Sequence, residues 1–110
     1  MLTDNSSVSS PAPELDVPAI RRSLEQQLRE REELISDLAP RAAPNIDPVA
    51  WATTAATRKV VGRIQAALER LADGTYGRCV RCGNAIVAGR LEVLPYGETC
   101  VACQNDVDNS

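Results

Sequence analysis

The chain has 110 residues, which is enough for one small domain. Fifteen acidic residues outnumber twelve basic ones and give a net charge of -3, a balance that argues against binding driven by neutralisation of nucleic-acid phosphates. Phe is absent and Trp51 is the only tryptophan, so the core must use small aliphatic side chains and would be marginal without a metal, disulfides or a partner.

Residues 1–15 are rich in Ser and Pro and show no apolar periodicity. This composition does not offset the entropy lost on ordering, and it predicts a disordered tail. The segment also lacks the basic and then apolar pattern of a secretory signal. Because no stretch approaches the roughly 20 apolar residues of a membrane span, we expect a cytoplasmic protein without membrane contact.

From Asp16 onward, apolar residues recur at steps of three and four while Arg, Glu and Gln occupy the other faces. This periodicity predicts one amphipathic helix that ends at Pro40. The apolar positions are Val17, Ile20, Leu24, Leu28, Leu34, Ile35 and Leu38.

After a turn with two prolines, a second helix is expected to begin at Asp47, a good N-cap, followed by Pro48 at the first helical position. Ile46 and Trp51 are placed to form a hydrophobic staple across this cap. Gly74 supplies the left-handed residue that commonly closes a helix. The apolar stripe of this helix comprises Val60, Val61, Ile64, Ala67, Leu68 and Leu71.

Two amphipathic helices joined by a short turn bury their stripes by packing antiparallel. The sequence therefore predicts a mainly α protein, with an antiparallel two-helix coiled-coil hairpin over residues 16–73 and its tip near residues 40–50. At about 1.5 Å per residue the hairpin is roughly 35 Å long. A small knob that contains four cysteines with the spacing of a C4 zinc finger is expected over residues 74–104, followed by a flexible tail over 105–110. The oligomeric state stays open, because periodicity does not distinguish pairing within a chain from pairing between chains.

Four cysteines form a C-x2-C-x17-C-x2-C pattern, with a spacing typical of zinc sites: Cys79, Cys82, Cys100 and Cys103. Two residues between paired cysteines let both thiolates face one ion, and Gly83 relieves the turn around it. Four thiolates fill a tetrahedron, so we expect one structural Zn²⁺ ion.

Two alternatives to zinc use the same cysteines. Paired disulfides require an oxidising compartment, which is not expected without an export signal. Iron in a rubredoxin-like site uses the same four ligands, and the spacing alone does not separate it from zinc. The sequence has no His, no Ser in a nucleophile setting and no glycine-rich phosphate loop, so we do not expect an enzyme.

The residues GTYGRCVRCG at positions 74–83, with Ile86, Arg90-Leu91-Glu92, Pro95 and the closing cysteine pair, resemble the DksA/TraR C4 zinc-finger family. The resemblance implies a bacterial regulator that binds RNA polymerase, inserts its hairpin into the secondary channel, and alters initiation without contacting DNA.

In that family the hairpin tip carries an Asp-Pro-x-Asp-x-Ala type motif, which is similar to Asp47-Pro48-Val49-Ala50-Trp51-Ala52 here. Asp47 and Ala52 match the motif, whereas Ala50 stands in place of the second acid. The resemblance implies that Asp47 and Ala52 contact the partner, with Asp47 as the effector group. Trp51 is a further candidate contact, because aromatic residues are enriched at binding hot spots. From the residues alone, Asp47 is an N-cap, and Trp51 belongs to the staple.

Two rival functions remain. The first is a zinc-stabilised interaction or adaptor protein that has the same fold and no channel activity, which Ala50 favours. The second is direct DNA binding through the finger, where Arg78, Arg81 and Arg90 lie; the acidic balance and the nearby acidic residues disfavour it, and these arginines are expected to serve solubility.

Overall fold

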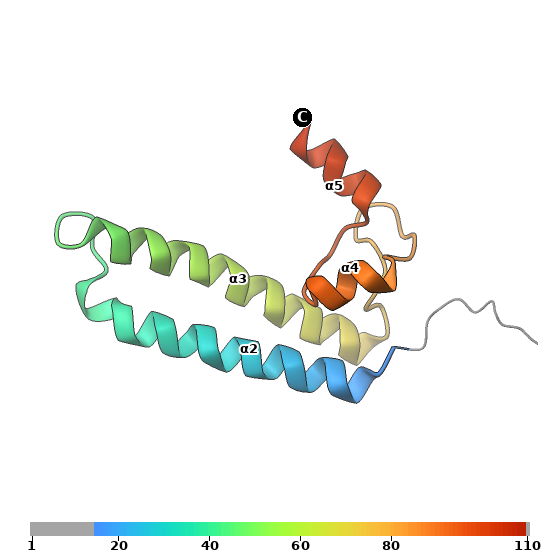
Figure 1. Ribbon diagram of the computed structural model, residues 1–110, viewed down its shortest axis with the longest axis horizontal. Helices are drawn as coiled ribbons and strands as arrows, with labels where there is room; N and C mark the ends of the chain where they lie inside the picture. The colour runs from blue at the N-terminus through green and yellow to red at the C-terminus, as the bar shows by residue number, and fades with distance from the viewer. Residues whose placement is uncertain (1–14, 110) are drawn as a thin grey trace, which may run out of the picture.

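The computed structural model describes residues 15–109 and is mainly helical, as predicted (Figure 1). Two long helices, α2 (Val17–Leu38) and α3 (Pro48–Asp73), lie side by side and are joined at one end by the short 3-10 helix η1 (Ala39–Arg41) and a turn. The short helices α4 (Ala88–Val93) and α5 (Val101–Asp108) belong to a knob at the other end of the pair. The antiparallel hairpin with a C-terminal knob is confirmed.

Each long helix begins and ends where local chemistry favours it. Asp16 caps α2, since its Oδ1 accepts a hydrogen bond from the backbone N–H of Ala19 at 3.1 Å. Pro48 occupies the first turn of α3, where its missing N–H costs nothing. Gly74 closes α3 with φ of 84°, a left-handed conformation that favours glycine.

The core of the hairpin lies in the half next to the knob. Leu24 and Ile64 are completely buried there, and Ala67 and Leu71 complete the cluster. Partly buried side chains from both helices and from the knob pack around it: Val17, Ile20, Leu28, Val60, Leu68, Tyr76 and Tyr96. The knob therefore covers the core of the hairpin base.

Toward the tip, small side chains continue the seam in place of large ones. Ala50, Thr54 and Thr57 are buried and recur along α3 at steps of four and three residues. The apolar stripe predicted for the second helix omitted all three, because it began at Val60. In α2, Leu34 was assigned to the stripe but is 41% exposed; consecutive helical residues point in different directions, and the neighbouring Ile35 is the more buried of the two.

Substitution by alanine is expected to have opposite effects on stability at two glycines, Gly62 within α3 and Gly74 directly after it. A Cβ at Gly62 would have nothing within 4 Å, so Gly62→Ala is expected to raise the free energy of unfolding by up to about 1 kcal/mol through helix propensity. At Gly74 the space is also open but φ is +84°, so Gly74→Ala is expected to destabilise the protein. Urea unfolding of both variants measures the difference; equal effects would contradict this account.

The ends of the folded part differ from the expected boundaries. The predicted disordered tail lies outside the described residues except for Leu15, which packs on the core of the knob. At the other end, a flexible tail was predicted from residue 105, and the structure continues α5 through this segment to Asp108. A side-chain hydrogen bond from Gln104 to Asp108 at 3.0 Å bridges one turn of α5. Within residues 15–109, no helix has the length and apolar character needed to cross a membrane.

Candidate metal centre and hairpin tip

The four cysteines of the knob converge on one point. The Sγ atoms of Cys79, Cys82, Cys100 and Cys103 all lie within 4.8 Å of one another, and none of these residues is in a disulfide. The Sγ atoms of Cys82 and Cys100 are 3.8 Å apart. A tetrahedral ion with bonds of about 2.3 Å to sulfur places its ligands about 3.8 Å apart, so the arrangement fits one such ion.

The first cysteine pair lies in a tight turn between residues 78 and 85, which form an isolated antiparallel bridge. The backbone N–H of Gly83 donates to the carbonyl of Cys79 at 2.9 Å, and Gly83 has φ of 79°. This left-handed residue lets the chain turn around the sulfurs, as predicted. The backbone N–H of Arg81 also points at Cys79 Sγ, at 3.4 Å.

The second pair begins α5. Cys100 is the N-cap, and its Sγ accepts a hydrogen bond from the backbone N–H of Cys103 at 3.5 Å. Both thiolates therefore lie at the positive end of a helix, which stabilises negative charge. The two pairs thus reach the ion from different local structures, a turn and a helix start.

Hydrogen bonds within the cysteine cluster shift the pKa values of two cysteines in opposite directions. Burial disfavours ionisation of Cys79, but backbone N–H groups of Cys100, Cys82 and Arg81 outweigh it and lower the pKa of Cys79 to about 6. Hydrogen bonds from Cys103 to Cys100 and Cys79 raise the pKa of Cys103 to about 12. A cation at the centre removes this competition for protons, since its binding releases them.

Two arginines of the finger donate hydrogen bonds to its backbone carbonyls, although their side chains are not buried. Arg81 donates from Nη1 to the carbonyl of Cys103 at 3.3 Å, which joins the two cysteine pairs. Arg90 donates from Nε to the carbonyl of Thr99 at 3.0 Å and so fixes α4 beside the second pair. Sequence reasoning assigned these side chains to solubility, because the carbonyls they reach are distant in sequence.

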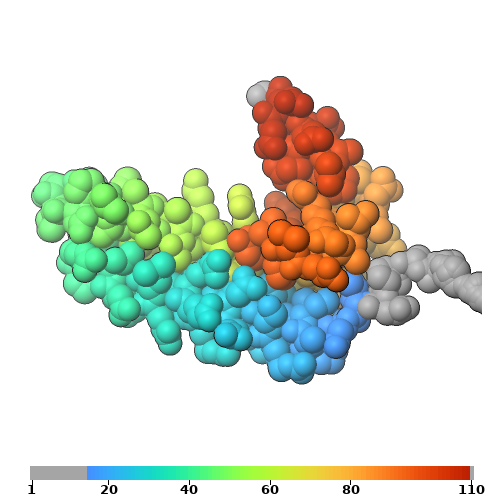
Figure 2. All heavy atoms as spheres, viewed as in Figure 1, coloured from blue at the N-terminus to red at the C-terminus, as the bar shows by residue number. Residues whose placement is uncertain are grey.

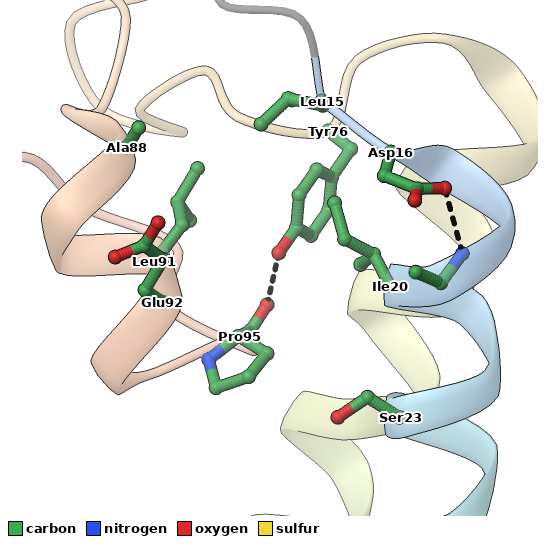
Figure 3. A pocket seen from close by; sticks show the side chains of 10 residues that line it. Leu15, Asp16, Ile20, Ser23, Tyr76, Ala88, Leu91, Glu92 and Pro95 are labelled. Atoms are coloured by element: carbon green, nitrogen blue, oxygen red, sulfur yellow. Dashed lines mark hydrogen bonds between the residues drawn. The ribbon is translucent and has the colours of Figure 1, made fainter.

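Tyr76 connects the finger to the base of the hairpin (Figure 3). Its hydroxyl donates to the carbonyl of Pro95 at 2.6 Å, and partial burial raises its pKa. Beside it lies a hollow of about 390 Å³ between the start of α2 and α4. Ile20 and Leu91 line this hollow from opposite sides, and the finger packs on the core of the hairpin through Tyr76 and Tyr96.

At the opposite end, Asp47 is held by two partners. Its Oδ1 accepts a hydrogen bond from the backbone N–H of Ala50 at 3.0 Å, as expected for an N-cap. Its Oδ2 accepts one from Nε of Arg41, also at 3.0 Å. The Ala50 N–H and the Arg41 guanidinium lower the pKa of Asp47 below its ordinary value. Sequence reasoning missed this ion pair, because Arg41 lies in the turn, six residues before Asp47.

The other predicted tip residues lie on the outside of α3. Ala52 is exposed, and Trp51 is 47% exposed beside Ala39 and Ala42 of the turn. The predicted staple does not shield its members, since Ile46 is 67% exposed. The tip therefore presents apolar side chains to solvent.

The pairing of Asp47 predicts a specific pH dependence of stability. Its folded-state pKa lies below the ordinary value of 3.8, so its contribution is complete above pH 3.8 and is lost as pH falls through the folded value. The Asp47→Asn variant keeps a capping oxygen and is expected to lose less melting temperature than the wild type between pH 5 and pH 2. Thermal melts monitored by circular dichroism measure this, and parallel profiles would contradict the pairing.

The C-terminal part of the chain matches a known family. Residues 74–109 match the model of the prokaryotic dksA/traR C4-type zinc finger, and these residues contain the complete four-sulfur site. Residues 74–109 therefore form a zinc finger of the DksA/TraR C4 type. The cofactor is therefore one zinc ion, as predicted, and a family C4 site with four converging thiols leaves no reason to prefer iron or disulfides.

Similar proteins cover different parts of the chain. It is 35% identical over 91 residues to the RNA polymerase-binding transcription factor DksA of Caulobacter vibrioides, covering 73% of this chain and 64% of that protein. It is 38% identical over 52 residues to general stress protein 16O of Bacillus subtilis, covering 47% of this chain and 32% of that protein. The chain thus spans less than two thirds of these relatives.

The fold is also similar to a solved structure. Transcription factor DksA2 from Pseudomonas aeruginosa superimposes with a TM-score of 0.58 at 22% identity, covering 84% of this chain and 78% of that one. At this identity the likeness concerns the fold, which is the arrangement of a helical hairpin and a knob.

Proposed function

We propose that this protein is a zinc-containing bacterial transcription regulator that binds RNA polymerase. In this proposal the hairpin tip enters the secondary channel and modulates initiation, and the protein does not bind DNA. The observation that carries it is the combination of a family C4 finger with a slender hairpin whose far end is distant from the finger (Figure 2).

The shape supports insertion. With 26 residues, α3 is about 39 Å long, and Figure 2 shows the hairpin extending well beyond the finger. A rod of this kind reaches into a channel that a globular surface does not enter. The family resemblance and the relative named as RNA polymerase-binding support RNA polymerase as the partner, and the net charge of -3 disfavours DNA.

The proposal assigns different roles to the two ends. The thiolates of Cys79, Cys82, Cys100 and Cys103 hold the zinc ion and fix the finger against the hairpin base. At the tip, Asp47, Trp51 and Ala52 contact the polymerase. Because Asp47 is paired with Arg41, it acts as an effector only to the extent that this pair opens.

The test is a binding experiment with the zinc-loaded protein and purified bacterial RNA polymerase core enzyme, competed by an established secondary-channel factor. Competed binding at micromolar concentration or better supports the proposal. Binding without competition places the protein elsewhere on the enzyme, and absence of binding rejects the proposal.

A zinc-stabilised adaptor without channel activity is the second candidate. One observation favours it: Ala50, at the position of the second acid in the family motif, is buried in the seam with only 3% of its surface exposed. The tip therefore has one carboxylate, and in vitro transcription separates the candidates. An adaptor binds its partner and leaves initiation unchanged.

A further inference from the structure

The segment that forms the tip of the hairpin and the first turns of α3 is almost uncharged. Between Leu38 and Arg58 the sequence contains two charged residues, Arg41 and Asp47, and these form an ion pair with each other. By contrast, α2 carries charged residues through most of its length. This segment therefore has no net charge to offer a partner.

Asp47 is not available as a free carboxylate in this arrangement. Both of its oxygens accept hydrogen bonds, one from the Ala50 N–H and one from the Arg41 guanidinium. A second acid at position 50 would begin from a buried site, since Ala50 is only 3% exposed. The tip therefore lacks both free carboxylates of an acidic tip, because Asp47 is paired with Arg41 and position 50 is an alanine.

In their place, three large apolar side chains are exposed at the tip. Ile46 is 67% exposed, Val49 is 74% exposed, and Trp51 is 47% exposed. They occupy the position before the cap and the second and fourth positions of α3. Helical residues two apart do not share a face, so these apolar tip residues are distributed around the end of the rod.

We propose that the apolar tip residues bind an apolar recess of the protein partner, which is RNA polymerase if the proposed function holds, and that Arg41 keeps the tip neutral by pairing with Asp47. A recess that encloses the tip contacts side chains on several faces, whereas a flat surface contacts only some of them. Pairing also reduces the cost of moving Asp47 out of water, because a lone buried carboxylate is strongly disfavoured.

Trp51 gives a direct test, because it is the only tryptophan of the chain and lies at the tip. The protein is produced with 5-hydroxytryptophan at this position, so that it can be excited apart from the tryptophans of the polymerase. Acrylamide quenching is then measured without and with core enzyme, and binding is followed separately by surface-immobilised polymerase. The inference expects quenching to fall severalfold in the complex. Unchanged quenching in a saturated complex means that the tip stays in water and overturns the inference.

Matched variants test the apolar contact independently. Val49→Ser is expected to weaken polymerase binding about tenfold, a change of about 1.4 kcal/mol. Val93→Ser removes an equally sized side chain that is 85% exposed in the finger, and it is expected to leave affinity unchanged. Arg41→Gln frees Asp47 and is expected to weaken binding, because an unpaired carboxylate then enters the recess.

The outcomes separate this inference from the proposed function. Wild-type protein that fails to bind polymerase rejects both. Wild-type binding with no effect of Val49→Ser, or with improved binding by Arg41→Gln, rejects only the apolar tip and supports an acidic one. Sedimentation of the free protein adds a check: a dimer that dissociates in the Val49→Ser variant would assign the tip to a second copy of the chain and overturn the inference.

Discussion

Removal of the zinc ion is expected to unfold the finger and to lower the melting temperature of the hairpin. Structural zinc sites contribute on the order of 10 kcal/mol or more to folding, which matches or exceeds the total stability of about 5–15 kcal/mol of a typical domain. The buried core of the finger is small, with Cys79, Ile86 and Leu91 as its members. Without the ion, Cys79 loses its bond to zinc, which is its main interaction in this core.

The effect on the hairpin follows from its contacts with the finger. Tyr76 and Tyr96 pack against the cluster around Leu24 and Ile64. When the finger unfolds, this face of the hairpin base is exposed to water, so α2 and α3 are expected to melt earlier while keeping part of their helicity. The finger is therefore expected to lose its folded structure completely, and the hairpin is expected to lose only part of its helicity.

Amide hydrogen exchange distinguishes the two parts. The backbone N–H of Ile86 donates to the carbonyl of Gly77 at 2.7 Å, and that of Val80 donates to the carbonyl of Glu98 at 2.9 Å. Both are expected to lose protection after treatment with a chelator and in the Cys82→Ser variant. Val80→Ser alters an exposed residue between two ligands and is expected to retain zinc and protection. Protected finger amides in metal-free protein would contradict a folding role for the ion.

Features that depend on local sequence could be predicted before the structure. The N-cap at Asp47, the glycine that ends α3 and the convergence of the cysteines each follow from residues a few positions apart or from a regular spacing. The same holds for the pairing of α2 with α3, since both helices carry an apolar stripe. These are the features for which chain geometry leaves few alternatives.

Features that depend on contacts across the fold could not be predicted. Thr54 and Thr57 face the seam although they are polar, and hydropathy patterns therefore overlook them. The Thr57 hydroxyl donates to the carbonyl of Thr53 at 2.7 Å, which lets it be buried at little cost. Leu15 was assigned to the tail because its role depends on the surface of a finger formed by residues more than 60 positions away. The ion pair at the tip likewise depends on the shape of a turn with two prolines.

The buried core of the hairpin lies in its base, beside the finger, so two leucine-to-alanine substitutions in α2 are expected to differ strongly in their effect on stability. Leu24 is fully buried in the cluster with Ile64, Ala67 and Leu71, and Leu24→Ala is expected to reduce the free energy of unfolding by about 2–5 kcal/mol through lost burial and a cavity. Leu34→Ala makes the same chemical change on the same helix, but that side chain is 41% exposed and the expected loss is under about 1 kcal/mol.

Urea unfolding of the zinc-loaded protein, followed by circular dichroism, measures both variants under one condition. If the wild-type free energy of unfolding is no larger than the loss expected for Leu24→Ala, this variant is partly unfolded without denaturant. The wild-type stability is therefore measured first, and zinc is kept in excess. Equal losses for the two variants would mean that the distal half is packed as firmly as the base. A large loss confined to Leu24→Ala instead locates the stability of the hairpin beside the finger, where zinc binding reinforces it, and leaves the distal half free to vary in sequence and to serve recognition.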